Sequence, residues 1–235
     1  MEAHIANFDL RQISVLLRGE PEPINAWIQK WSARRTALYV AVIAAGAGLY
    51  GASMGYWRDP LQALYTGIKF PLIMLLTTVG NGLLNAMLAP LLGLNIGFRQ
   101  SLQAVLMSFT ISAAILGSFS PVSFFVIWNT PAMSHAFGPY SFIQLMHVAV
   151  IAFAGTIGNI RLGELLHRLG GSRSVGRRVL LAWLSGNLLL GSQLSWIFRP
   201  FIGSPNLPVQ FLRAHPFDGN FFETLYYAFR AIFFS

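Results

Sequence analysis

The sequence predicts an all-α, polytopic transmembrane helix bundle of about five spans, with amphipathic interfacial helices at both ends. Charged residues make up 10% of the 235 residues, whereas soluble domains carry about 25%. Apolar residues make up 54% and gather in five segments of about 20 residues, the length that crosses a bilayer. A surface this poor in charge would not stay in water, so the composition excludes a soluble enzyme and a nucleic-acid-binding protein.

Residues 1–35 are predicted to form cytoplasmic amphipathic interfacial helices. Two apolar stripes follow helical spacing. The first consists of Leu10, Ile13, Leu16 and Leu17, with Asp9 as the N-cap of its helix, and the second consists of Ile24, Trp27, Ile28 and Trp31. An apolar tryptophan face beside Arg34 and Arg35 is typical of a helix at the inner membrane surface. A groove on a cytoplasmic partner would use the same stripe, so both alternatives stay open.

Residues 36–198 are predicted to form a five-span transmembrane bundle. The spans are Thr36–Tyr56, Phe70–Leu91, Ala104–Phe125, Ser141–Ile160 and Val179–Phe198, and none has an ionised residue in its interior. Asp59, followed by Pro60, is a typical helix start and predicts a short helix over Pro60–Lys69 before the second span. The fourth span should continue inward until the Gly170-Gly171 pair ends it.

The basic residues predict the orientation. With the N-terminus inside, the inner segments hold 11 Lys and Arg residues and the outer segments hold 5, which favours a cytoplasmic N-terminus and a periplasmic C-terminus in a bacterial inner membrane. Residues 199–235 are predicted to form an outer-face loop and an aromatic interfacial helix, capped by Asn220 with Glu223 at its third position. The alternative is that residues 221–234 form a partial sixth span, although 14 residues are short for a span.

Small and amide side chains in the spans predict helix packing. The first span carries a GxxxG pattern, which permits close approach of a helix from this chain or another. Amides should face the bundle interior, because an unsatisfied amide in hydrocarbon is costly. Interhelical hydrogen bonding is the favoured interpretation, and a polar transport path is the alternative. The helix-packing set is Gly48, Gly51, Gly55, Asn81, Asn85, Asn187 and Gly191; the path would be lined by Asn81, Asn85, His147 and Asn187.

Gln144 and His147 lie one helical turn apart in the fourth span and are the candidate contacts for a quinone or lipid. The sequence has no Cys and no HExxH, GxSxG or phosphate-binding glycine loop. We therefore expect no catalytic residue, no metal and no cofactor. The candidate docking residues for lipid or a partner are Trp27, Trp31, Arg34 and Arg35 on the inner side and Arg199 and Arg213 on the outer side. On the outer side we also expect surface ion pairs between the carboxylates of Asp59, Asp218 and Glu223 and the guanidinium groups of Arg58, Arg199 and Arg213.

Three stretches, Leu16–Pro21, Leu49–Thr78 and Ser192–Arg213, resemble a group of bacterial multi-span inner-membrane proteins that is uncharacterised. The five-span plan with an amphipathic lead is similar to that of Yip1-type proteins. Neither resemblance implies a catalytic residue or a substrate. The expected function is a non-catalytic membrane subunit that anchors or assembles with partner proteins, or with copies of itself, in the lipid bilayer and binds no nucleic acid. The alternatives are a transporter, channel or permease subunit and a quinone- or lipid-binding subunit.

Overall fold

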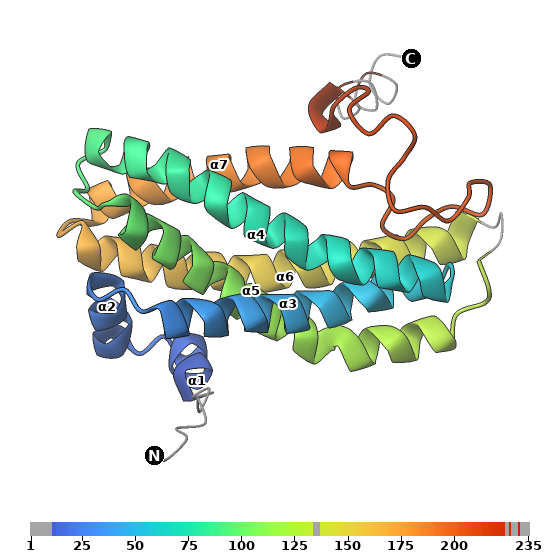
Figure 1. The fold of residues 1–235 in the computed structure, drawn as a ribbon, viewed down its shortest axis with the longest axis horizontal. Coiled ribbons are helices and arrows are strands. Elements are labelled where there is room, and N and C mark those ends of the chain that lie inside the picture. The colour runs from blue at the N-terminus through green and yellow to red at the C-terminus, as the bar shows by residue number, and fades with distance from the viewer. Residues whose placement is uncertain (1–10, 134–136, 224–225, 227–229, 231–235) are drawn as a thin grey trace, which may run out of the picture.

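The structure is a computed structural model, and it describes residues 11–133, 137–223, 226 and 230 (Figure 1). Within these ranges the chain is helical and contains no strand, which confirms the all-α prediction. The predictions that fall on Asp9, Leu10, His135 and most of 224–235 lie outside the described residues. In chain order the helices are α1 (Arg11–Arg18), α2 (Pro21–Gln29), α3 (Ala33–Tyr56), α4 (Pro60–Leu91), α5 (Phe98–Trp128), α6 (Phe137–Leu169) and α7 (Arg173–Ile197).

Four of these helices, α3, α4, α5 and α6, are long and apolar enough to cross a membrane. Their length and composition confirm the prediction of a helical membrane protein. The fifth predicted span corresponds to α7, which has 25 residues but is not among the helices that are apolar enough for the same assignment. Its second half is diluted by Ser185, Asn187, Ser192, Gln193 and Ser195.

The predicted helix starts and ends are present, but the helices are longer than the predicted spans. Asp59 accepts a hydrogen bond from the Leu61 amide at 2.7 Å, as an N-cap does. From there α4 continues through Pro71 as one helix of 32 residues, in which the predicted short helix runs directly into the second span. Transmembrane helices tolerate such prolines because neighbouring groups satisfy the freed carbonyl. Gly171, with φ of +60°, follows the end of α6.

Helices α3, α4 and α5 pack directly on one another, and glycines make this close approach possible. A Cβ atom at Gly51 would lie 2.6 Å from the Thr66 carbonyl oxygen of α4, and one at Gly48 would lie 3.2 Å from the Gly67 carbonyl oxygen. Gly55 faces the Gln62 carbonyl in the same way. The predicted glycine surface of the first span is thus occupied within the chain by α4.

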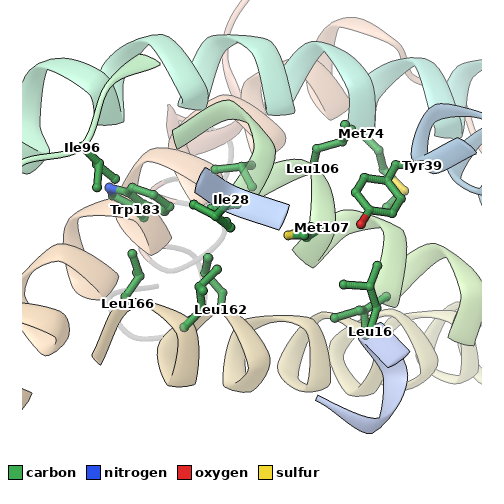
Figure 2. Close-up of a cluster of buried hydrophobic side chains, with 14 of the residues drawn as sticks. Leu16, Ile28, Tyr39, Met74, Ile96, Leu106, Met107, Leu162, Leu166 and Trp183 are labelled. Carbon is green, nitrogen blue, oxygen red and sulfur yellow. The ribbon is translucent and has the colours of Figure 1, made fainter. Parts of the chain in front are cut away.

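The remaining contacts close a ring. Helix α5 packs on α6, α6 on α7, and α7 on α4, while α3 lies against α4 and α5. The largest buried cluster lies in the half of the bundle that carries α1 and α2, which we call the inner half. There Trp183 of α7 lies near Leu166 of α6 and Ile96 (Figure 2). Leu16 of α1 and Ile28 of α2 are each 1% exposed in this cluster. The apolar stripes of the two N-terminal helices therefore pack largely on the bundle itself.

Candidate functional site

A cavity of about 460 Å³ lies inside the ring of α4, α5, α6 and α7. We call it the central cavity. Its volume is within the range of about 300–1,000 Å³ that ligand pockets occupy. Apolar side chains form most of its wall. The polar groups among them are Thr77 of α4, Ser108 and Ser112 of α5, Asn159 of α6, and Asn187, Ser192 and Ser195 of α7.

The central cavity is not fully enclosed, and the more exposed part of its lining lies on α6 and α7. On α4 and α5 most of its lining side chains are buried, whereas every lining residue on α6 and α7 is at least partly exposed. Helix α7 accounts for this difference, because its buried residues, Gly176, Val179 and Trp183, all lie in its first half. From Gly191 to Arg199 each residue is partly exposed, so the outer half of α7 does not fully enclose the cavity.

The Asn81 and Asn187 amides predicted from the sequence join α4 to α7 beside the central cavity. The Asn81 amide of α4 donates to the Trp183 carbonyl at 3.2 Å and to Asn187 Oδ1 at 2.6 Å, both on α7. Gly186 provides the space that Asn81 needs. Gly191 lines the cavity opposite Thr77. Asn85 is buried, and its amide has no partner among the described residues.

A second cavity, of about 350 Å³, lies at the other end of the bundle from α1 and α2. We call it the outer cavity. It brings together Gln144 and His147 of α6, the two residues that the sequence marked as candidate ligand contacts. Ile151 lines both cavities. The four residues of the predicted polar path do not line one cavity. Asn81 contacts Asn187, but Asn187 lines the central cavity, His147 lines the outer cavity, and Asn81 and Asn85 line neither.

His147 is 1% exposed, and a tyrosine fixes its ring. Its Nδ1 lies 2.9 Å from the hydroxyl of Tyr50 in α3, and the two rings meet edge to face at 5.5 Å. Tyr50 is fully buried, so its hydroxyl proton needs this acceptor. With the tyrosine donating to Nδ1, a neutral imidazole carries its proton on Nε2. Nε2 has no partner among the described residues.

Residues 200–203 form part of the outer cavity wall, and α4 holds them in place. Lys69 is fully buried, and its Nζ donates to the Pro200 carbonyl at 2.8 Å. The Gln62 amide donates to the Pro200 and Phe201 carbonyls at 3.0 and 2.9 Å, and the Thr66 hydroxyl donates to Phe201 at 2.7 Å. The sequence alone did not indicate this role, although residues 62, 66 and 69 share one helical face.

Three cations at the outer end, Lys69, Arg199 and Arg213, influence one another. Arg213 lines the outer cavity and acts electrostatically on Lys69. The pKa of the Arg199 guanidinium is lowered first by burial and then by the charge of Arg213, while Asp218 opposes both. Contrary to the predicted ion pairs, no carboxylate of the described residues pairs with Arg58, Arg199 or Arg213. Arg58 and Arg199 donate to backbone carbonyls instead.

The inner docking candidates are engaged within the chain to different degrees. Arg35 donates to the Trp27 and Lys30 carbonyls at 3.2 and 3.4 Å, and its guanidinium lies 5.0 Å from the Trp27 ring. Trp31 is 53% exposed, and Arg34 is exposed as well. Trp31 and Arg34 are therefore more exposed to solvent than Trp27 and Arg35.

In the part of the chain that the structure describes, no group of three or more His, Asp or Glu residues could hold a metal ion. Comparisons with protein-family models, with curated proteins and with solved structures find no match. The two cavities and their lining residues are therefore the features from which a function is inferred.

Proposed function

We propose that this protein is a non-catalytic integral membrane protein that binds a molecule of the lipid class in its central cavity. The observation that carries the proposal is a mainly apolar cavity of about 460 Å³ inside the ring of four helices, with the more exposed part of its lining on α6 and α7. A ligand that enters sideways between membrane helices comes from the bilayer, which supplies apolar and amphiphilic molecules.

The chemistry of the cavity wall supports a lipid over an ion or a charged solute. No Asp, Glu, Lys, Arg or His is among its lining residues. A charged solute at membrane depth would need an opposite charge or several polar groups to replace its hydration. The hydroxyl and amide groups at Thr77, Ser112 and Asn187 suit a few hydrogen bonds to an ester, a hydroxyl or a carbonyl of an otherwise apolar molecule.

We also propose that α7 is the fifth span, with the N-terminus in the cytoplasm of a bacterium and the C-terminus outside its inner membrane. The excess of basic residues in the segments at the α1–α2 end supports this orientation. Since the chain has no Cys, single cysteines report it. A membrane-impermeant maleimide should label Asn206→Cys on intact spheroplasts and Ser174→Cys only after permeabilisation. Labelling of both from the same side would contradict the fifth span.

Lipid binding is tested by substitutions that fill the central cavity with larger side chains without disturbing the helix packing. A Cβ atom at Gly155 has no neighbour within 4 Å, and one at Gly191 meets only Thr77 Oγ1 at 4.0 Å. Gly155→Leu with Gly191→Leu should therefore occupy the cavity. Gly138→Leu is the matched control, because it also adds a side chain to α6 in open space but away from the cavity.

Native mass spectrometry of the purified chain, released from nanodiscs, measures the outcome. We expect the wild-type chain and the Gly138→Leu variant to retain a lipid at activation energies that strip the filled variant. Equal retention by all three chains, or no retained lipid on the wild-type chain, would contradict lipid binding in the central cavity.

Assembly with a partner protein is the second candidate function, and helix α6 favours it. Only 22% of its most apolar window is buried, against 44–50% for α3, α4 and α5, so α6 has the largest free apolar face among the four. Phe142, Leu145 and Phe153 are more than half exposed on it. A particle well above the 25.9 kDa of one chain after solubilisation in mild detergent would favour this role, and a single chain would contradict it.

A further inference from the structure

The outer cavity has the features of a ligand site of a different kind from the central cavity. It is bounded by Met54 at the end of α3, the first turns of α6, residues 200–204 and Arg213. Part of this wall is apolar, with Val148, Ile151 and Ile202 among its members. The rest carries polar groups and the positive charge of Arg213, whereas no charged residue lines the central cavity.

No described carboxylate forms an ion pair with Arg213, the charged residue that lines the outer cavity. Arg213 lies near two further cations, Lys69 and Arg199, which it affects electrostatically. The ion pairs among the described residues involve other groups. Lys69 donates to a backbone carbonyl, which contributes no full negative charge. Arg213 and the two neighbouring cations repel one another, and an anion bound beside Arg213 in the cavity would lower that cost.

A buried hydrogen-bond donor is available in the same cavity. The His147 ring lines the cavity and is 1% exposed. With Nδ1 committed to Tyr50, the proton on Nε2 has no acceptor among the described residues. Buried donors are rarely left unpaired in folded proteins. Gln144, one turn away on α6, adds an amide to the same wall.

We propose that the outer cavity binds an oxyanion, a phosphate or carboxylate group of an amphiphile, between the Arg213 guanidinium and His147 Nε2. A guanidinium offers two parallel donors that match the oxygens of such a group, and the imidazole adds a third. Met54, Val148 and Ile151 then contact the apolar part of the ligand. This site goes beyond the lipid proposed for the central cavity, and neither proposal requires the other.

Isothermal titration calorimetry of the full chain in a neutral detergent tests the site with three probes. These are dihexanoyl phosphatidic acid, dihexanoyl phosphatidylcholine and inorganic phosphate. We expect phosphatidic acid to bind at least about tenfold more tightly than phosphatidylcholine, since charged hydrogen bonds are lost with the neutral headgroup. Binding of phosphatidic acid alone identifies a lipid headgroup as the source of the oxyanion, whereas comparable binding of phosphate identifies a soluble anion.

Two variants and a charge-matched control locate the site. Arg213→Gln should weaken phosphatidic acid binding by about tenfold or more. His147→Asn retains an amide near the Nδ1 position for Tyr50 but removes the donor at Nε2, so it should weaken binding by several-fold, and His147→Gln should restore part of it. Arg173→Gln removes the same charge at the first residue of α7, away from the cavity, and should bind as the wild type does.

The His147→Asn variant keeps the test valid if Arg213→Gln does not fold, as judged by its circular dichroism. The filled variant of the central cavity should bind phosphatidic acid normally, so failure of one site is distinguishable from failure of the other. The proposal is overturned if neither anion binds the wild-type chain, or if the folded Arg213 and His147 variants bind phosphatidic acid as tightly as the wild type.

Discussion

The two halves of α7 are held in different ways, and two tryptophans show the difference. Trp183 in the inner half is fully buried among side chains of α2, α6 and the α4–α5 connection. Trp196 in the outer half is partly exposed, and its contacts include a hydrogen bond from Nε1 to the Asp218 carbonyl at 3.1 Å and the Arg199 guanidinium, which lies 3.9 Å from the ring centroid. Packing therefore fixes one half of the helix, while the other half leaves the central cavity accessible.

The two ends of the bundle repeat this contrast. At the inner end α1 and α2 place Leu16 and Ile28 in the apolar core. At the outer end, Gln62 and Lys69 hold the segment after α7 by hydrogen bonds to carbonyls, beside a cavity of about 350 Å³. The largest buried apolar cluster thus lies toward the inner end, and the ligand-accessible volume lies toward the outer end.

The largest expected effect compares the two tryptophans directly. Trp183→Ala should lower the free energy of unfolding by about 3–5 kcal/mol, because it leaves a large void in a close-packed cluster. Trp196→Ala should lower it by about 1 kcal/mol, since mainly one hydrogen bond is lost. Unfolding in mixed detergent micelles, followed by circular dichroism, measures both. Equal losses would remove the distinction between the two halves of α7.

The next effect compares two glycines. Gly51→Ala should destabilise the fold by about 1–3 kcal/mol, because the new Cβ would lie 2.6 Å from the Thr66 carbonyl and force α3 and α4 apart. Gly155→Ala meets nothing within 4 Å and should be close to neutral. The same unfolding assay measures the pair. A costly Gly155→Ala would mean that the central cavity is smaller than the structure indicates.

A smaller effect is expected at the outer segment. Ile202 is 8% exposed in the wild type, so a cysteine at this position in an Ile202→Cys variant reports how firmly the segment is held. In this background, Gln62→Leu should increase the rate of maleimide labelling by about tenfold, because two hydrogen bonds to residues 200–201 are lost. Gln100→Leu is the control, since Gln100 bonds Gln29 at the inner end, and it should leave the rate unchanged. An unchanged rate in Gln62→Leu would show that packing, not hydrogen bonding, holds the segment.

The smallest effect is expected at the amide pair. Asn187→Ala should cost about 0.6 kcal/mol, the average for a side-chain hydrogen bond between membrane helices, since the Asn81 amide keeps its bond to the Trp183 carbonyl. Melting in detergent would detect the shift against Ser185→Ala on the exposed side of α7. A loss above about 2 kcal/mol would give this amide pair a role equal to that of the inner core.

Local features were predictable from the sequence, because short-range rules determine them. The cap at Asp59 follows from residue type and spacing, and the membrane helices follow from apolar length. The packing of α1 and α2 on the bundle was not predictable, since the same apolar stripe suits a membrane surface, a partner or the chain's own core. Helix α7, which is less apolar than the other long helices, was predicted as a span from its length. Length alone does not show that its outer half contains no buried residue.

Among the candidate site residues, the sequence identified the polar groups but not their partners. Gln144 and His147 were singled out as one pair and do line one cavity. The contact of His147 with Tyr50, 97 positions away, required the fold. Lys69 was placed at the end of the short helix predicted before the second span, and its role depends on a residue 131 positions later. Long-range pairing of this kind leaves no periodic signal in a single sequence.

Photo-cross-linking tests the central claim most directly, namely that a lipid enters the central cavity beside the outer half of α7. The probe is a phosphatidylcholine with a diazirine within one acyl chain, incorporated with the protein into nanodiscs. We predict cross-links on cavity-lining residues of α5 and α7, such as Ser112 and Leu184, and their loss in Gly155→Leu with Gly191→Leu. Cross-links confined to the free face of α6, at Leu145 and Phe153, and unchanged in the filled variant would contradict the account.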